Sequence, residues 1–331
     1  MLFLIILYII VLRKFLKVLA VLFILIVSSG VVCAQENASD VLADDYNQIL
    51  ADSNNDVLGE PLKTFTDLKN DISGAVDVFE VTIDYKFDNA TDNKDGVIIQ
   101  GRDALIINGK GHVIDANGQS RIFLINVSQN IVINDLTFIN TNASMGGALG
   151  ILGSSVATNN VTFKDCFSKD SVIYAVNSNY MSNHDTFKNS TSLKKGVVGL
   201  YNSNGIFDYA TFLSSKNLEW GFIYDMGGSN IVLSNSVFAN STSKYSTAVK
   251  AANKLKIVNT TFTNLYALLS AGAIAVKKMD YCEIDGCTFV NVSSEKNGGA
   301  LFSDTLNRVY ILNSSFTNCF SGFGGAILTK Q

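Results

Sequence analysis

Residues 231–238 read Ile-Val-Leu-Ser-Asn-Ser-Val-Phe, and residues 309–316 read Val-Tyr-Ile-Leu-Asn-Ser-Ser-Phe. In both segments apolar residues alternate with polar ones up to a phenylalanine, which predicts a short strand with one buried face. The phenylalanine returns every 24 to 27 residues. Its eight positions are Phe138, Phe163, Phe187, Phe212, Phe238, Phe262, Phe289 and Phe316. A fixed period of this size is typical of a repeat protein, whose units bury their apolar faces against one another.

Each repeat carries two further marks around its phenylalanine. An asparagine or aspartate stands two places after it in seven repeats, and Ser214 takes that place in the eighth. The seven are Asn140, Asp165, Asn189, Asn240, Asn264, Asn291 and Asn318. A glycine followed by small apolar residues, such as Gly298-Gly-Ala-Leu301, precedes the next phenylalanine by about 16 residues. The apolar runs are too short for helices, so the repeat is predicted to consist of strands and turns.

Three short strands in each repeat fit an all-β fold, a single-stranded parallel β-helix. Each turn of such a coil returns the chain one strand spacing higher, which supplies the crossover that parallel pairing needs. Equivalent side chains then stack in columns along the axis. We expect an inward column of phenylalanines, a column of amides at the turn after it, and a partial ladder three places before it. This partial ladder consists of Asn160, Asn235, Asn259 and Asn313.

Composition narrows the class of protein. Of the 331 residues, 47% are hydrophobic and only 16% are charged, which indicates a folded chain rather than a disordered one. The repeats run without interruption, so we expect one elongated domain rather than two compact ones. The net charge of −4 and the lack of a basic stripe argue against nucleic-acid binding.

The first 34 residues have the pattern of an export signal. Arg13, Lys14 and Lys17 precede an apolar run, and Val32-Cys-Ala34 offers small residues before Gln35, the expected first mature residue. An extra apolar stretch lies ahead of the basic cluster. The alternative is therefore an uncleaved membrane anchor formed by residues 1–27, although charges interrupt it. A cleaved signal peptide and an uncleaved anchor both predict a secreted or cell-surface protein.

Residues 64–73 are predicted to form a short helix that covers the open end of the coil. Thr64 or Thr66 can cap it, and Phe65, Leu68 and Ile72 fall on one face. Solenoids need such caps because their terminal repeats lack a neighbour.

The expected domain organisation follows from these segments. Residues 1–34 form the signal peptide or anchor, 35–60 a flexible leader, 61–96 the N-terminal cap and 97–331 the β-helix repeats. The sequence stops partway through a repeat, so we expect an uncapped C-terminal end whose strand edge could pair with another chain. The protein could accordingly be a fragment of a larger surface protein, or could associate end to end.

The cysteines are predicted to remain free. Export permits disulfides, but Cys166 and Cys319 hold the same place six repeats apart, about 29 Å at one strand spacing per repeat. Cys282 and Cys287 lie on one strand, too far apart to bridge. A zinc site is also unsupported, because Cys-x4-Cys has no matching partner pair. We expect buried thiols, no metal and no cofactor.

The repeat motifs carry a family resemblance. The tandem Gly-Gly-Ala-Ile/Leu and Phe-x-x-Asn-type motifs resemble the repeats of polymorphic outer-membrane proteins. Residues 105–115, Leu-Ile-Ile-Asn-Gly-Lys-Gly-His-Val-Ile-Asp, with 121–123 and 136–140, resemble the first coils of adhesin-like proteins of methanogenic archaea. The resemblance covers about residues 62–331. It implies a right-handed β-helix, of the pectate-lyase-like type, displayed at the cell surface.

Parallel β-helices also host polysaccharide lyases and glycoside hydrolases. An enzyme of this kind would carry carboxylates at equivalent positions of neighbouring repeats. Glycoside hydrolysis needs two carboxylates within about 5–9.5 Å, which here means adjacent coils. Asp280, Glu283 and Asp285 cluster on one coil, where a solvated strand edge explains them better. Asp225 and Asp304 are near-equivalent but three coils apart. His184 replaces an asparagine of the partial ladder and is better read as a turn residue. No catalytic residue is predicted.

Ten Asn-x-Ser/Thr sequons occur, as expected by chance in a chain rich in these residues. Asn89, Asn142 and Asn291 are predicted to lie in turns and are the preferred glycan acceptors.

The sequence therefore predicts an adhesin-like β-helix that binds a host or neighbouring-cell surface protein or glycan without catalysis. A carbohydrate-active enzyme of the pectate-lyase-like fold is the alternative.

Overall fold

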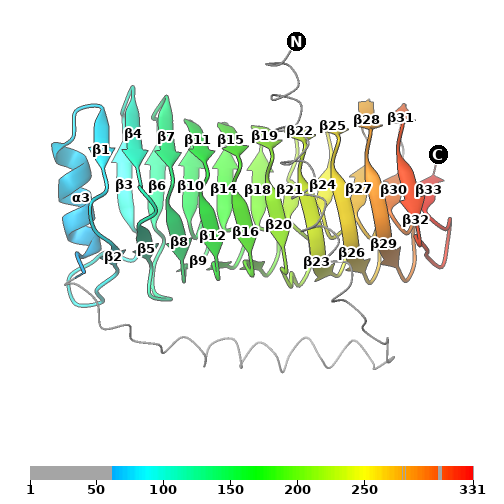
Figure 1. Ribbon diagram of the computed structural model, residues 1–331, viewed down its shortest axis with the longest axis horizontal. Helices are drawn as coiled ribbons and strands as arrows, with labels where there is room; N and C mark the ends of the chain where they lie inside the picture. The colour runs from blue at the N-terminus through cyan, green and yellow to red at the C-terminus, as the bar shows by residue number, and fades with distance from the viewer. Residues whose placement is uncertain (1–61, 278, 280, 305–307, 331) are drawn as a thin grey trace, which may run out of the picture. The chain divides into compact units, whose positions relative to one another are not determined.

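The structure is a computed structural model that describes residues 62–330 except 278, 280 and 305–307. The predicted signal peptide or anchor (1–34) and the leader (35–60) lie outside these residues. The described chain is a right-handed parallel β-solenoid of about ten turns with one short helix at its N-terminal end (Figure 1). The predicted all-β fold class is confirmed.

Three parallel sheets of ten strands make up the described coil, and each turn gives one strand to each sheet. Sheet 1 consists of β1 (Val78–Glu80), β4 (Leu105–Asn108), β7 (Ile131–Asn134), β11 (Ser155–Asn159), β15 (Asn179–Asn183), β19 (Asn204–Asp208), β22 (Asn230–Ser234), β25 (Lys254–Val258), β28 (Tyr281–Asp285) and β31 (Val309–Leu312). Sheet 2 consists of β2 (Tyr85–Lys86), β5 (Val113–Asp115), β8 (Thr137–Ile139), β12 (Thr162–Lys164), β16 (Thr186–Lys188), β20 (Thr211–Leu213), β23 (Val237–Ser243), β26 (Thr261–Ala267), β29 (Thr288–Ser294) and β32 (Ser315–Thr317).

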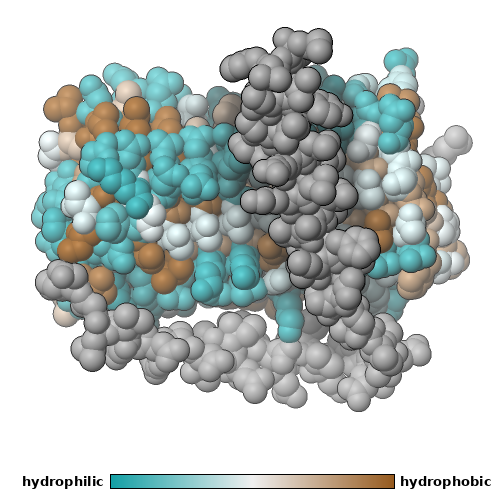
Figure 2. Space-filling view, viewed as in Figure 1, coloured by the Kyte–Doolittle hydropathy of each residue, from teal (hydrophilic) through white to brown (hydrophobic). Residues whose placement is uncertain are grey.

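Sheet 3 consists of β3 (Val97–Gln100), β6 (Phe123–Asn126), β10 (Leu149–Leu152), β14 (Ile173–Val176), β18 (Val198–Tyr201), β21 (Ile223–Asp225), β24 (Val249–Ala251), β27 (Ile274–Lys277), β30 (Leu301–Asp304) and β33 (Ile327–Lys330). A small fourth sheet extends one corner and consists of β9 (Asn142–Ala143), β13 (Phe167–Ser168) and β17 (Thr191–Ser192). Because the sheets alternate inward and outward residues, polar and apolar side chains form rows along the stack, as one face shows in Figure 2.

The eight phenylalanines pair in register from β8 to β32 and face the core. From Phe163 to Phe316 successive rings stack with centroids 4.4–5.1 Å apart and planes within 11°. Only the first pair is tilted, with Phe138 and Phe163 at 55°. Burying each ring contributes about 1.5–3 kcal/mol, and each ring pair adds about 0.5–1.5 kcal/mol. This column is the spine of the core.

The residue two places after each phenylalanine has a left-handed backbone, with φ between 51° and 55° in all eight repeats. Asparagine and aspartate tolerate this conformation best among residues with a side chain. The amides also bond along the stack. Asn264 Nδ2 donates to Asn240 Oδ1 at 2.9 Å, and Asn291 Nδ2 donates to Asn264 Oδ1 at 3.1 Å. The asparagine column thus satisfies both backbone geometry and side-chain hydrogen bonding.

The column three places before each phenylalanine is left-handed as well, with φ between 47° and 63°. This explains why asparagine shares the column with aspartate and glycine, and it places His184 at a turn with φ 55°. The ring of His184 stacks on Tyr209 of the next coil at 4.7 Å. The interpretation of His184 as a turn residue is confirmed.

A ladder of buried serines was not anticipated from the sequence. The backbone N–H groups of Ser128, Ser154, Ser178 and Ser203 each donate to the hydroxyl of the serine on the next coil, at 3.0–3.2 Å. The last acceptor is Ser229. These hydroxyls satisfy backbone donors at the corner between sheets 3 and 1, where the strands are interrupted.

The helix α3 (Phe65–Gly74) covers the first coil, as predicted. Thr64 and Asp67 form a capping box, and Phe65, Leu68 and Ile72 are buried. Asp92 ties the helix start to the coil by accepting from the N–H groups of Phe65 and Thr66 at 3.0 and 2.7 Å. The segment predicted as a cap (61–96) also contains β1 and β2, which already pair with β4 and β5.

The four cysteines of the described residues are free, as predicted. Cys166, Cys282 and Cys287 are buried and Cys319 is partly so. Burial raises the pKa of the Cys166 thiol to about 12, which keeps it protonated and unreactive.

A buried carboxyl group interrupts the apolar interior. Asp185 Oδ1 accepts from the N–H of Val161 at 2.7 Å, and Oδ2 accepts from the hydroxyls of Ser182, at 2.7 Å, and Thr158. Tyr180 shares the Thr158 hydroxyl at 2.9 Å. Burial outweighs these bonds and raises the pKa of Asp185 from 3.8 to about 6.

We expect Phe212→Ala to destabilise the coil by about 3–5 kcal/mol, because Phe212 is fully buried between two stacked rings. Phe316→Ala is the matched control, since that ring is only partly buried and stacks on one described neighbour. Urea unfolding followed by circular dichroism would compare the two. Equal losses would contradict the role assigned to the column.

We expect the stability of the wild type to carry a pH-dependent part that Asp185→Asn lacks. The raised pKa favours the neutral form in the folded state, so the contribution is complete below about pH 4 and is lost as pH rises through 6. A shift from 3.8 to about 6 corresponds to about 3 kcal/mol. Free energies of unfolding of both proteins between about pH 4 and 7.5 would test this. Parallel pH profiles would refute it.

Candidate functional site

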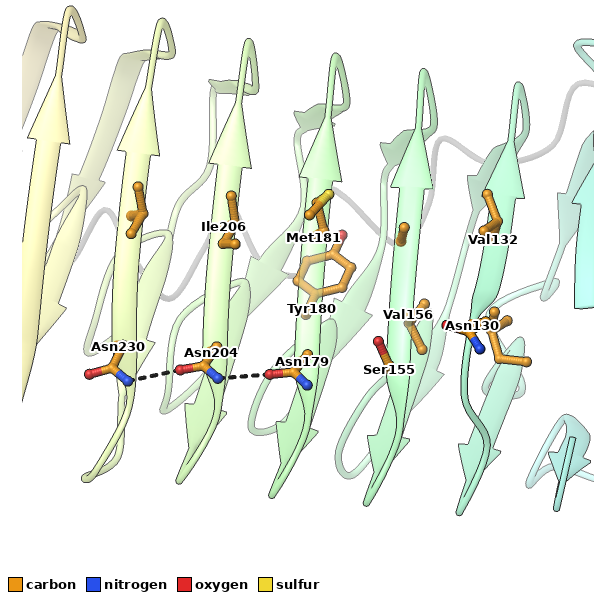
Figure 3. Close-up of a pocket in the computed structure, with 13 residues that line it drawn as sticks. Asn130, Val132, Ser155, Val156, Asn179, Tyr180, Met181, Asn204, Ile206 and Asn230 are labelled. Atoms are coloured by element: carbon orange, nitrogen blue, oxygen red, sulfur yellow. Dashed lines mark hydrogen bonds between the residues drawn. The ribbon is translucent and has the colours of Figure 1, made fainter. Parts of the chain in front are cut away.

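A groove of about 420 Å³ runs across five coils on the outer face of sheet 1 (Figure 3). It crosses β7, β11, β15, β19 and β22. Thirteen residues line it: Asn130, Ile131, Val132, Ser155, Val156, Ala157, Asn179, Tyr180, Met181, Asn204, Ile206, Asn230 and Val232. Its lining contains none of the carboxylates that were weighed and rejected as catalytic residues.

The floor of the groove is an apolar column. Val132, Ala157, Met181, Ile206 and Val232 pair in register and point outward. Met181 is 45% exposed, Ile206 38% and Val232 36%. A run of exposed apolar side chains at one strand spacing is a continuous ribbon, which is a mark of an interaction surface.

A row of amides borders the column on one side. Asn204 Nδ2 donates to Asn179 Oδ1 at 2.7 Å, and Asn230 Nδ2 donates to Asn204 Oδ1 at 2.8 Å (Figure 3). Asn253 continues the row with a bond of 3.1 Å to Asn230. Each linked amide in the middle of the row retains one N–H and one oxygen lone pair for a ligand.

A second row of amides borders the column two residues further along each strand. Asn134 Nδ2 donates to Asn108 Oδ1 at 2.9 Å, and Asn159 Nδ2 donates to Asn134 Oδ1 at 2.8 Å. Asn183 extends the row at 3.4 Å. The two rows overlap only on β15, which carries Asn179 on one side of the column and Asn183 on the other. On β19 the position after Asn183 in the second row is Asp208. The first row lines the groove, whereas the second row lies outside its lining.

The groove carries no formal charge. None of the thirteen lining residues, all of them in the described chain, is an aspartate, glutamate, histidine, lysine, arginine or cysteine. Tyr180 is the one titratable group among them, and its hydroxyl is buried against Thr158. Burial raises its pKa well above the usual value, so it remains neutral. The lining can bind by contact and hydrogen bonds but offers no group for proton transfer.

The same outward column becomes charged beyond β22. Lys256, Glu283 and Tyr310 follow Val232 in register. Lys256 Nζ and Glu283 Oε1 form an ion pair at 3.1 Å. The apolar floor therefore ends at the fifth coil of the groove.

The carboxylates weighed as catalytic candidates have structural partners. Glu283 also accepts from the hydroxyl of Tyr281, and Asp285 accepts from Asn313 Nδ2 at 2.9 Å. Asp280 lies outside the described residues. Asp225 is buried and accepts from three backbone N–H groups, and Asp304 lies three strands away in sheet 3. Asp225 and Asp304 therefore stay apart, and Glu283 and Asp285, two residues apart on the outer face of β28, are each held by structural partners.

The preferred sequons take different positions. Asn89 is exposed in a turn, as predicted. The prediction of turns is wrong for the other two, because Asn142 lies in β9 and Asn291 in β29. Asn291 is also tied into the amide column, where it donates to Asn264 and accepts from Asn318. Asn89 remains the best-placed acceptor.

Neither a metal centre nor a membrane-spanning helix is present in the part of the chain that the structure describes. No three histidine, cysteine, aspartate or glutamate side chains there gather into a potential metal site. No described helix is long and apolar enough to cross a bilayer.

Comparison with known proteins gives few matches. No protein-family model matches the chain, and no curated protein matches it. Among solved structures, the coil is similar to PfbA, a surface adhesin of Streptococcus pneumoniae, with a TM-score of 0.42 and 11% identity. The similarity covers 82% of this chain and 93% of that one. At this TM-score the likeness supports no functional argument.

Proposed function

We propose that this chain is an adhesin-like binding protein of the cell surface and that the groove on sheet 1 holds an extended, uncharged glycan. The observation that carries the proposal is the make-up of the groove. An exposed apolar floor is bordered by a row of ordered amides, and none of the thirteen lining residues carries a formal charge. The sequence resemblance of the repeats to adhesin-like proteins of methanogenic archaea and to polymorphic outer-membrane proteins supports the same function.

The chemistry of the groove favours a sugar chain over other extended ligands. A pyranose ring presents an apolar face of C–H groups and an edge of hydroxyls that both donate and accept. The floor matches the face, and the free N–H and lone pair of each amide match the edge. The coils repeat at about 4.8 Å, close to the length of one sugar ring in an extended chain. Successive sugars can therefore meet equivalent groups.

Binding without catalysis is favoured for the same site. Acid–base chemistry on a glycosidic bond requires carboxyl groups beside it, and the lining residues supply none. The export-like pattern of residues 1–34 supports a location outside the cell. The rigid coil would then present the groove to a neighbouring or host surface.

We expect Met181→Lys to weaken glycan binding at least tenfold, because an ammonium group would stand in the apolar floor. Tyr310→Lys is the matched control. It lies in the same outward column with a similar exposure, 41% against 45%, but outside the groove. A glycan array with the full chain would identify a neutral ligand, and titration would then compare the variants.

The same samples would be assayed for new reducing ends and unsaturated sugars. Release of either would replace the adhesin proposal with the carbohydrate-active alternative. Neutral-glycan binding that Met181→Lys leaves intact would remove the groove as its site, and binding of extended peptides alone would change the ligand class.

A further inference from the structure

The outer face of sheet 3 carries aromatic rings on alternate coils. Tyr174 on β14, Gly199 on β18 and Tyr224 on β21 pair in register, and Lys250 on β24 follows. The two tyrosines are therefore two strand spacings apart, about 9.6 Å. Gly199 projects no side chain between them. A Cβ there would lie 2.3 Å from Ser171 Oγ, so the position is closed to larger residues.

Lysine ammonium groups accompany these rings. Lys195 Nζ lies 5.9 Å from the ring centroid of Tyr174, and Lys250 Nζ lies 4.7 Å from that of Tyr224. Lys244 lies 5.4 Å from the centroid of Tyr245. At these distances the ring faces attract the cations and hold them in place. We call this set, together with Trp220, the lysine–tyrosine patch.

Trp220 joins the patch into one platform. Its ring stacks on Tyr245 at 4.6 Å and 23°, and it lies 5.1 Å from Tyr224. All four aromatic side chains are half-buried, with part of each surface open to solvent. Rigid aromatic groups with one exposed side offer contact area at low conformational cost.

The lysines of the patch differ in whether a carboxylate pairs with them. Asp170 pairs with Lys195 at 3.1 Å, and Glu219 precedes Trp220. Lys250 donates to the backbone oxygen of Asp225. No carboxylate among the described residues forms an ion-pair contact with Lys250. The side chain of Asp225 accepts from three backbone N–H groups and acts on Lys250 only as a nearby charge.

Because Lys250 is partly buried, an anion supplied by a ligand would stabilise its ammonium group. Desolvation lowers the pKa of Lys250, the charge of Asp225 raises it by less, and the neighbouring ammonium of Lys277 lowers it further. A partly buried cation without a paired anion gains from a ligand that supplies one. The patch therefore offers two aromatic rings two coils apart and an ammonium group that forms no ion pair with a described carboxylate.

We propose that the lysine–tyrosine patch binds an acidic glycan, a chain of sugars that carry carboxylate groups. Two sugars lie against the solvent-exposed parts of the Tyr174 and Tyr224 rings, whose faces the lysines approach, and a carboxylate of the chain reaches the ammonium of Lys250. Two strand spacings are close to the length of a disaccharide in an extended chain, which favours a sugar over an acidic peptide. The patch and the groove lie on different sheets, so this inference is independent of the proposed neutral ligand.

The test uses the full chain and fragments of alginate, hyaluronan and galacturonan, each beside its methyl ester. We expect at least one acidic fragment to bind and its ester to bind at least tenfold more weakly. Because the ester keeps the sugar chain and removes the charge, this comparison needs no variant. Added salt is expected to weaken binding of the acid.

Variants then locate the site. Lys250→Met keeps the aliphatic stem and should lower affinity for the acidic fragment about tenfold. Tyr224→Ala should do the same, whereas Tyr224→Phe retains the ring and should bind as the wild type does. Lys188→Met is the matched control, because it removes an exposed lysine of β16 on sheet 2, outside both sites, and should leave acidic binding unchanged. Circular dichroism would verify that each variant is folded.

Three results would overturn the inference. These are equal binding of acid and ester, acidic binding that Lys250→Met and Tyr224→Ala leave intact, and failure of every acidic fragment to bind. Binding of polyglutamate with the same dependence on Lys250 and Tyr224 would assign the patch to acidic peptides instead.

Discussion

Register between neighbouring coils is the constraint on which the rest of the structure depends. Each phenylalanine lies over its equivalent one strand away, and a slip by one residue would turn the whole core face outward. The stacked rings inside, the amide ladder two places after them and the buried serine hydroxyls at a corner all require the same alignment. The period of 24 to 27 residues varies only where turns absorb the difference.

The same register creates the outer surfaces. A side chain that recurs on successive strands becomes a ribbon, so Met181 and Ile206 form a continuous apolar floor rather than isolated exposed residues. Alternation along each strand sets the amide rows beside that floor. On sheet 3 the register places Tyr174 and Tyr224 two coils apart with Gly199 between them. Both candidate sites thus result from the stacking of equivalent strands. The groove on sheet 1 is apolar and uncharged, whereas the patch on sheet 3 carries lysines and aromatic rings, so we propose different ligands for them.

Much of the fold was accessible from the sequence because its signals repeat. The phenylalanine column, the helix with Phe65, Leu68 and Ile72 buried, and the free cysteines all follow from position within a period. Predictions that depended on one local segment were wrong at two positions. Asn142 and Asn291 were expected in turns, but Asn142 pairs with Phe167 in a short strand, and strand pairing resumes on both sides of Asn291. Local composition does not reveal where a ladder ends.

By itself, the sequence determined a stacked coil with an aromatic spine, because a fixed period and alternating apolar residues permit few other ways to bury them. It also indicated that the carboxylates would not converge, since equivalent positions can be counted. Only the tertiary structure decided which outward residues become sites. Whether Lys250 meets a carboxylate, whether Tyr180 turns its hydroxyl inward, and which amides link depend on side-chain directions and distances across coils. These are set by three-dimensional packing, which the repeat period alone does not specify.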